Sequence, residues 1–338
     1  MRILVDAMGG DHAPLAVLNG CIRAKSELGV TPVLVGNAAV LKNAAESAGI
    51  DLSGLEILHA ERAIGMDDLP LSVRSIPDSS IRIGLTALSK GQADAFVSAG
   101  NTGALQLGAN LFVGRINGIS RSAIATVLPC KNPVLLLDCG ANATFTPELL
   151  CEYAAMGSVY MKKVCGVAHP RVGLLNIGSE PYKGTPGHAQ TNKLLSELSQ
   201  IGFVGNIEPA ALIEGACDVL VADGFSGNVL LKTMESAVKY TLSKIEDAAK
   251  GQSSLERILR QDQTLSARYY GVKKQFDPSE YGGAPFLGIR APVIKAHGNS
   301  DAGAIKNAIR QASLYAAGQV VKEIEQALDG VFCQRNDQ

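Results

Sequence analysis

Residues 133–142 read PVLLLDCGAN, an apolar run that ends in an acidic, glycine-containing turn. The apolar residues are consecutive rather than alternating, which predicts a strand that is buried on both of its faces. Such strands are typical of parallel sheets that helices cover on both sides. This segment therefore favours an α/β fold.

Further apolar runs of the same kind recur along the chain. They are ILVDA, PVLVG, LEILHA, DAFVSAG, IATVLP, RVGLLNIG and DVLVADG, which begin at residues 3, 32, 55, 94, 124, 171 and 218. Segments with helical spacing lie between or after them, at residues 147–166, 186–200, 228–250 and 301–328. In the third segment an apolar stripe is formed by Leu231, Met234, Val238 and Ile245. Because strands and helices alternate, we predict an α/β fold with a largely parallel sheet.

Several of the predicted strands end in polar turns that mix glycine with Asn, Asp or Ser. These turns occupy residues 6–11, 98–104, 138–142, 176–180 and 223–228. Tight turns need glycine for positive φ angles, and that explanation is sufficient for any single turn. In open α/β sheets, however, ligands bind outside the carboxyl ends of the strands, where backbone N–H groups are free. The five turns together predict that the substrate binds at this edge.

The composition excludes several classes of protein. With 46% hydrophobic and 19% charged residues in 338, the chain can bury a sizeable core and is not a disordered protein. A formal net charge of −1 gives no reason to expect a nucleic-acid partner. The seven cysteines are scattered and include no CxxC pair, which predicts small core residues in a reducing cytoplasm.

The chain is expected to be cytoplasmic. Its first residues, MRILVDAMGGDHAP, lack the longer apolar run and cleavage site of a signal peptide. No run of about 18 apolar residues occurs, so no segment is expected to span a bilayer. Peripheral contact with a membrane stays open.

A basic segment at residues 239–274 stands out, because eight Lys or Arg residues there face four Asp or Glu residues, giving a local net charge of +4. Within it, SSLERILRQ at 253–261 has the pattern of a short basic amphipathic helix. We hypothesise that a protruding helical segment here contacts an acidic protein or an anionic membrane. An ordinary solvated helix face is the alternative.

Several common kinds of active site are absent from the sequence. There is no P-loop motif, no G-x-G-x-x-G linked to a strand and no H-E-x-x-H motif. The turn GFSGN lacks the last glycine of G-x-S-x-G because position 228 is Asn, so Ser226 is a weak nucleophile candidate. What remains is a set of polar residues suited to anions: Ser98, Asn101, Thr102, Asp138, Asn142, Glu180, Lys183, Asn228 and His297.

The motifs in their order resemble those of the bacterial PlsX family, the acyl-acyl-carrier-protein:phosphate acyltransferases. The segments that carry the resemblance are VDAMGGDHAP, VSAGNTGA, LLDCGAN, NIGSEPYKG, GNIEP, DGFSGN, YGGAPFLGI and HGNS, which span nearly the whole chain. The resemblance implies a three-layer α/β/α fold similar to that of isocitrate and isopropylmalate dehydrogenases, but without the nicotinamide. No cofactor and no metal are therefore expected.

The resemblance also implies a reaction and its partners. The acyl group of acyl-acyl carrier protein would pass to inorganic phosphate, and the acyl phosphate would be the first step toward phosphatidic acid in bacterial phospholipid synthesis. The expected partners are acyl carrier protein, inorganic phosphate, a second copy of the chain in a homodimer, and a membrane-bound glycerol-3-phosphate acyltransferase. We expect one catalytic α/β unit over residues 1–333, with a protruding basic helical segment within 239–280 and a tail at 334–338.

Phosphate near pH 7 can attack a thioester directly, because a thiol with a pKa of about 8.5 is a tolerable leaving group. The expected catalytic residues are therefore positioners. Lys183 would hold phosphate, Asn228 would contact the oxyanion or phosphate, and His297 would protonate the sulfur or bind phosphate. Helix capping is the alternative for Asn228, and a structural role is the alternative for His297.

Further residues are expected to bind substrate or to support the turns. The predicted substrate-binding residues are Gly9, Gly10, Ser98, Asn101, Thr102, Asn142, Gly178 and Gly227. Asp6, Asp11 and Asp138 are expected to brace the glycine turns by accepting backbone N–H bonds, since a negative charge would repel phosphate.

Two alternatives remain open at the level of sequence. The first is an NAD-dependent dehydrogenase on the same kind of fold, with a metal held by Asp138, Asp223 and Glu180. The second is a non-catalytic sensor of phosphate or acyl ligands that docks on carrier protein through the basic segment. Reduced-nicotinamide absorbance with candidate hydroxy acids would identify the first, and saturable binding without turnover the second.

Overall fold

The structure, a computed structural model, describes residues 1–248, 267, 271, 273, 274, 276, 280 and 282–333. Its strands are β1 (Arg2–Asp6), β2 (Thr31–Gly36), β3 (Glu56–His59), β4 (Ala95–Ser98), β5 (Ala123–Leu128), β6 (Val134–Leu137), β7 (Arg171–Leu175), β8 (Gly202–Ile207), β9 (Val219–Val221), β10 (Ala284–Leu287) and β11 (Val293–Lys295). Its helices are α1 (Leu15–Leu28), α2 (Ala38–Ser47), α3 (Ser72–Ser75), α4 (Ser80–Ser89), α5 (Thr102–Gly108) with the π-helical turn η1 (Ala109–Val113), α6 (Pro147–Lys163), α7 (Pro186–Glu197), α8 (Pro209–Ile213), α9 (Gly224–Ala248), α13 (Ala302–Ala317) and α14 (Val320–Cys333).

Every apolar run that predicted a strand forms one, and the helices expected in the second half of the chain are also present. The continuous helix expected over 301–328 is wrong, because the chain breaks between α13 and α14. Gln319 there has a φ of 49°, a left-handed conformation that ends a helix. The strands β8, β10 and β11 were not predicted, since Gly interrupts the apolar residues of β8, Pro those of β10, and β11 is only three residues long.

Within the described residues, the sheet has 11 strands in the order β3-β2-β1-β4-β11-β10-β5-β6-β9-β7-β8. It contains two parallel blocks, β3-β2-β1-β4-β11 and β6-β9-β7-β8. Between them, β10 pairs antiparallel with β11 and β5, and β5 pairs antiparallel with β6. The expectation of a largely parallel sheet is confirmed, but the two blocks run in opposite directions.

This reversal changes where the glycine turns lie. The prediction of one shared edge is wrong: the turns after β1 and β4 leave the first block in one direction, and those after β6, β7 and β9 leave the second in the other. The register nevertheless keeps the two groups close. The pairs that link the blocks are Ser98↔Lys295, Lys295↔Ala284, Phe286↔Ile124 and Ala125↔Leu137. Along the strand direction, Leu137 therefore ends about one residue, roughly 3.3 Å, from the level of Lys295.

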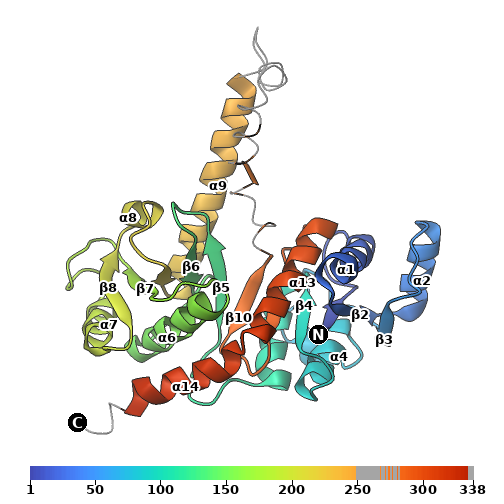
Figure 1. Ribbon diagram of the computed structural model, residues 1–338, viewed down its shortest axis with the longest axis horizontal. Coiled ribbons are helices and arrows are strands. Elements are labelled where there is room, and N and C mark those ends of the chain that lie inside the picture. The colour runs from blue at the N-terminus through green and yellow to red at the C-terminus, as the bar shows by residue number, and fades with distance from the viewer. Residues whose placement is uncertain are drawn as a thin grey trace.

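Helices cover both faces of the sheet and make three layers (Figure 1). One core cluster packs residues of α1, α6, α13 and α14 against one face, and a second packs α4, α5 and α8 against the other. Alternation within β1 shows the two faces, because Ile3 and Val5 belong to the first cluster and Leu4 to the second. The C-terminal helices join the two halves, since α13 packs on α1 and α14 packs on α6.

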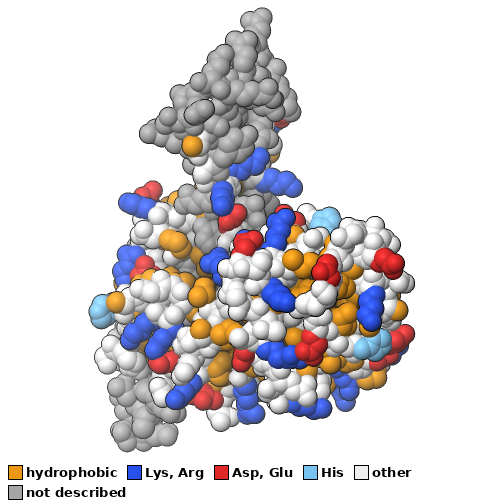
Figure 2. Space-filling view, turned by 45° about the vertical axis from the view of Figure 1, so that its right-hand side comes forward, with side chains coloured by type: hydrophobic (Ala, Val, Ile, Leu, Met, Phe, Trp, Pro, Cys, Tyr) orange, Lys and Arg blue, Asp and Glu red, His pale blue; other side chains and the backbone are white. Residues whose placement is uncertain are grey.

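The long helix α9 projects from the body of the molecule (Figure 1). Lys and Arg side chains lie on the described part of this projection and around its base (Figure 2). Most of the expected basic segment, including residues 253–261, lies outside the described residues, as does the tail at 334–338. The protrusion and the domain boundaries therefore stay predictions. Among the described residues, no helix is both long enough and apolar enough to cross a membrane.

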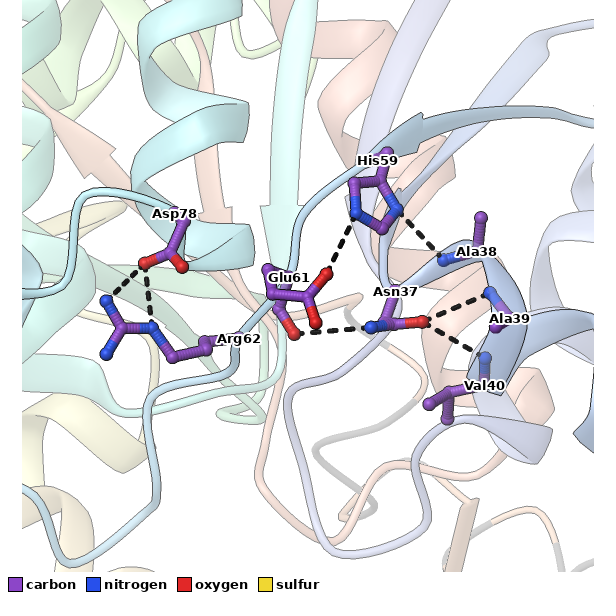
Figure 3. A network of polar contacts seen from close by, with 8 residues as sticks. All are labelled: Asn37, Ala38, Ala39, Val40, His59, Glu61, Arg62 and Asp78. Atoms are coloured by element: carbon purple, nitrogen blue, oxygen red, sulfur yellow. Dashed lines mark hydrogen bonds and ion pairs between the residues drawn. The ribbon is translucent and has the colours of Figure 1, made fainter.

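A surface network fixes the outer edge of the first block (Figure 3). Asn37 caps α2, because its Oδ1 accepts the backbone N–H groups of Ala39 and Val40 at 3.1 and 3.2 Å. His59, at the end of β3, accepts the N–H of Ala38 and pairs with Glu61 at 3.1 Å. These contacts use the free N–H groups of this helix end internally.

The contact between α4 and β4 gives a test of the packing. A methyl group on Gly84 would lie 2.2 Å from a ring carbon of Phe96, which is fully buried. We predict that Gly84→Ala lowers the free energy of unfolding by about 1–3 kcal/mol through overpacking. Adding Phe96→Leu should recover part of this loss, as measured by urea unfolding of the two single variants and the double variant. Strictly additive effects would contradict the contact.

Candidate active site

A buried carboxylate organises the turn at residues 138–142. Oδ1 of Asp138 accepts the backbone N–H groups of Ile124, Gly140 and Ala141 at 3.2, 3.2 and 3.0 Å. Oδ2 accepts the backbone N–H and the side-chain amide of Asn142 at 2.8 and 2.9 Å. Burial raises the pKa of Asp138, while these hydrogen bonds oppose the rise. The expected bracing role of Asp138 is confirmed.

A second carboxylate braces the opposite turns. Oδ2 of the buried Asp6 accepts the hydroxyl of Ser98 at 2.7 Å, and its Oδ1 accepts the N–H of Met8 at 3.1 Å. A Cβ on Gly9 would lie 2.5 Å from Asp6 Oδ2 and 2.7 Å from the backbone nitrogen of Gly100, so only glycine allows these turns to touch. Asp11 differs from the expectation, since its exposed side chain lines a cavity instead.

The side chains of two asparagines that were predicted to bind substrate instead form hydrogen bonds within the protein. Asn101 caps α5 by accepting the N–H of Ala104 at 2.9 Å, and its amide donates to the carbonyl oxygens of Gly65, Met66 and Asp68. The amide of Asn142 donates to the carbonyl of Ser122 and to the hydroxyl of Tyr153, both at 2.8 Å. In this structure both side chains position the turns.

The first turn of α9 packs directly against the turn at 138–142. A Cβ on Gly227 would lie 1.9 Å from the carbonyl oxygen of Asp138, and the backbone N–H of Gly224 donates to Asn142 at 2.8 Å. Asp223 caps the helix by accepting the N–H groups of Phe225 and Ser226 at 3.0 and 2.9 Å. Since Asp223 is the cap, the capping alternative for Asn228 is wrong.

A cavity of about 520 Å³ opens between the two blocks, on the face that α9 covers. One of its walls is apolar and comes from β5, α9 and Phe276. Its apolar side chains are Ile124, Val127, Leu128, Leu231, Met234, Val238 and Phe276. Its other end is polar and includes Asp11, Thr102, Gly140, Asn228, Lys295 and His297. The turns of both blocks therefore contribute to one site.

Three of the predicted site residues line this cavity, namely Thr102, Asn228 and His297. Each comes from a different element: the start of α5, the second turn of α9 and the loop after β11. Nδ1 of His297 accepts the N–H of Asn299 at 3.1 Å, which fixes the ring and leaves Nε2 for another partner. Ser98, Gly9, Gly10 and Gly227 lie behind the cavity as packing residues.

Lys183 and Gly178 do not line the cavity. They belong to the loop at 176–184, which follows β7 and lies beside the end of its neighbour β9. The amide of Asn176 donates to the carbonyl of Lys183 at 3.0 Å, and the amide of Asn206 donates to the carbonyl of Glu180 at 2.7 Å. The loop backbone is therefore held, and the Lys183 ammonium lies 5.9 Å from the centre of the Tyr182 ring.

Sequence reasoning missed Lys295, the last residue of β11. Its side chain is only 8% exposed and lines the polar end of the cavity. Burial lowers its pKa to about 8, although Asp6 and Asp11 oppose this effect. The signal was a single lysine in the otherwise apolar segment PVIKA, a residue type that is rarely buried without a partner.

The cavity wall also contains a thiol and an ion pair. The thiol of Cys139 donates to the carbonyl of Ile124 at 3.3 Å, and burial raises its pKa well above the usual range, so it stays protonated. On α9, the ammonium of Lys232 pairs with Glu235 at 2.7 Å. Cys139 is therefore a poor nucleophile, and the charge of Lys232 is already compensated.

The alternative metal site can be compared with the structure. Asp138 is enclosed by N–H donors, and Asp223 caps α9. Across the described part of the chain, no group of three or more His, Cys, Asp or Glu side chains is arranged to hold a metal ion. Five of the cysteines are buried as free thiols, namely Cys21, Cys130, Cys139, Cys151 and Cys217, whereas Cys165 is exposed.

Comparison with known proteins finds relatives that match this chain over nearly its full length. The family model described as "Fatty acid synthesis protein" matches residues 1–323. A phosphate acyltransferase of Thermotoga maritima is 42% identical over 332 residues, which cover 98% of each chain. A phosphate acyltransferase of Clostridium perfringens is 41% identical over 331 residues, which cover 97% of each chain.

Solved structures with the same fold are more distant in sequence. The EutD phosphotransacetylase from Staphylococcus aureus gives a TM-score of 0.60 at 16% identity, with 95% of this chain and 94% of that chain covered. A 4-hydroxythreonine-4-phosphate dehydrogenase from Burkholderia phymatum gives 0.50 at 16% identity, with 93% and 98% covered. At this identity the likeness shows the fold alone, and the expected three-layer fold of the dehydrogenase type is confirmed.

The bracing role of Asp138 can be tested by Asp138→Asn. One oxygen that now accepts N–H groups becomes an NH₂ group facing those donors, so the free energy of unfolding should fall by about 1–3 kcal/mol. Urea unfolding measures the change, with the exposed Asp67→Asn as the matched control. Equal stability of the two variants would contradict this role.

The burial of Lys295 predicts a pH-dependent stability. The folded chain releases this proton near pH 8, whereas the unfolded chain holds it until about the ordinary value of 10.5. The unfolded state therefore binds more protons in this window, and the stability of the wild type should rise with pH relative to Lys295→Met. Parallel stability curves for the two proteins between pH 8 and 10.5 would show that the site is not buried in this way.

Proposed function

The chain belongs to the fatty acid synthesis protein family and is an acyltransferase of the phosphate acyltransferase kind, and we propose that it transfers a fatty acyl group from acyl carrier protein to inorganic phosphate. The product would be an acyl phosphate. This reaction would be the first step toward phosphatidic acid in bacterial phospholipid synthesis.

The cavity is the observation that carries this proposal. Its lining combines apolar side chains from β5 and α9 with a set of polar and charged side chains. An acyl thioester has the same division, since its chain is apolar while its reacting carbonyl meets a charged phosphate. Burying the chain against the apolar wall would gain about 25 cal/mol per Å² and would leave the carbonyl among the polar groups.

The chemistry requires no covalent intermediate on the protein. An oxygen of the phosphate dianion forms a bond to the carbonyl carbon, the carbon–sulfur bond breaks, and the thiolate leaves to take a proton from solvent. A protonated, buried Cys139 cannot compete as the nucleophile. Catalysis then rests on alignment of the two substrates and on stabilisation of the oxyanion.

The residues at the polar end can take these roles. The side-chain amide of Asn228 would donate to the carbonyl oxygen as negative charge develops on it, and Thr102 lies on the same cavity. His297 would contact the sulfur or the phosphate through Nε2. Lys183 stays our predicted phosphate contact on the neighbouring loop at 176–184, which places a further cation at the carboxyl end of β7.

The proposal includes partners beyond the two substrates. A membrane-bound glycerol-3-phosphate acyltransferase would consume the acyl phosphate. Because acyl phosphates hydrolyse readily, direct transfer to that enzyme would limit their loss to water. A homodimer and a peripheral membrane contact near the basic segment at 239–274 belong to the same proposal. The Lys and Arg side chains near the base of α9 support an acidic partner surface there (Figure 2).

The reaction can be measured in one mixture of protein, palmitoyl-acyl carrier protein and phosphate. We expect free carrier thiol and hydroxylamine-trappable acyl phosphate to appear together, in equal amounts and only when phosphate is present. Thiol release without acyl phosphate would instead identify a thioesterase. Tight carrier binding without release would identify a sensor.

The role of Asn228 predicts a catalytic effect without a structural one. Its side chain is exposed in the cavity and caps no helix, so Asn228→Ala should lower kcat about 100-fold while leaving the melting temperature unchanged. Thr233→Ala, an exposed position on the same helix, is the matched control. An equal effect of both substitutions on kcat would remove Asn228 from the mechanism.

A further inference from the structure

Lys295 lies on the innermost strand of the first block, next to the antiparallel strands β10 and β5 that link the two blocks. It is the last residue of β11, and it pairs with Ser98 on β4 and with Ala284 on β10. Its side chain is more than nine-tenths buried, yet it lines the polar end of the cavity. A charged lysine in the centre of a sheet needs a compensating partner.

The protein supplies only part of that compensation. The Lys295 ammonium donates to the carbonyl oxygens of Ala99, at 3.1 Å, and Ala296. Among the described residues, no carboxylate forms an ion pair with it within 4.0 Å. An ammonium has three N–H donors, so the third has no partner in the described part of the chain. A buried cation of this kind is suited to an anionic ligand.

The nearby acidic groups do not replace such a ligand. Asp6 attracts Lys295 from a distance, but its oxygens accept the hydroxyl of Ser98 and the N–H of Met8. Asp11 also acts from a distance and lies at the exposed rim. A second lysine on the cavity wall, Lys232, is paired with Glu235.

We propose that Lys295 binds the phosphate dianion at the polar end of the cavity through its third N–H donor. This inference rests on the proposed function and deepens it, since it assigns the attacking phosphate to the Lys295 side of the cavity, across from the acyl-binding wall. The lowered pKa of Lys295 agrees with this assignment, because a bound dianion would raise that pKa again. Phosphate binding near pH 8 should then take up protons from solution.

Other titratable groups near Lys295 could also take up protons when phosphate binds. Charged or titratable groups are Asp6 on β1, Asp11 in the following turn and His297 after β11, with Lys232 and Glu235 on α9 across the cavity. The elements packed against β11 contribute the uncharged residues Ser98, Ala284 and Ala304. Replacing Lys295 alone leaves all of these in place.

The test is calorimetric titration of the full chain with inorganic phosphate at pH 8, in two buffers of different ionisation enthalpy. We expect the wild type to take up protons on binding, and Lys295→Met to bind phosphate about 10- to 100-fold more weakly without that uptake. Lys295→Gln, which keeps a donor for the carbonyl oxygens but no charge, should behave in the same way. The exposed Lys193→Met is the matched control and should bind as the wild type does.

The possible results separate this inference from the function on which it rests. If the wild type forms acyl phosphate but both Lys295 variants bind phosphate as tightly and with the same proton uptake, only the role of Lys295 is overturned. A wild type that neither binds nor consumes phosphate overturns both. A parallel titration with pantetheine 4′-phosphate distinguishes the source of the phosphate group. If the Lys295 variants lose affinity for this ester but not for inorganic phosphate, the assignment to inorganic phosphate is overturned.

Discussion

The structure depends on two buried carboxylates that collect backbone N–H groups where strands end. Asp138 gathers the turn at 138–142 and ties it to β5, and Asp6 ties the turn after β1 to the turn after β4. A buried carboxylate without hydrogen-bond partners would be costly, but here both oxygens of each carboxylate accept hydrogen bonds, from backbone N–H groups and, for Asp6, also from the hydroxyl of Ser98. These contacts hold the two groups of glycine turns in shapes that leave Thr102, Asn228 and His297 facing a common cavity.

The opposed directions of the two parallel blocks explain why that cavity exists. In a single parallel sheet all carboxyl ends lie at one edge, but here β10 and β5 reverse the direction between the blocks, and the register brings their ends to nearly the same level. Each block therefore contributes turns to a site in the middle of the molecule. The helix α9 starts from one of these turns and closes the cavity with an apolar stripe. An apolar wall beside a braced polar end is what a phosphate acyltransferase needs for its two unlike substrates.

Much of this could be predicted from the sequence, because local patterns determine local structure. Consecutive Val, Ile and Leu residues gave the buried strands, and the family resemblance gave the fold that solved structures share. The reversal between the blocks could not be predicted, since it depends on β10 and β11, which have only four and three residues, and Pro285 interrupts the apolar residues of β10. For the same reason, the sequence could not predict where Lys183 and Lys295 lie relative to the cavity. From the sequence, Asn101 and Asn142 are plausible ligand-binding amides. Only the tertiary structure shows that both amides donate hydrogen bonds to backbone carbonyl oxygens of the protein.

In the proposed mechanism, phosphate itself, held at the polar end of the cavity, attacks the thioester. This mechanism is tested most directly by incubating the protein with palmitoyl-acyl carrier protein in the absence of phosphate, while following thiol release and the intact mass of the protein. We predict no thiol release and no gain in mass until phosphate is added, because Cys139 is buried and protonated and no acyl-enzyme is needed. A burst of one thiol per protein, together with the mass of a bound acyl group, would contradict it.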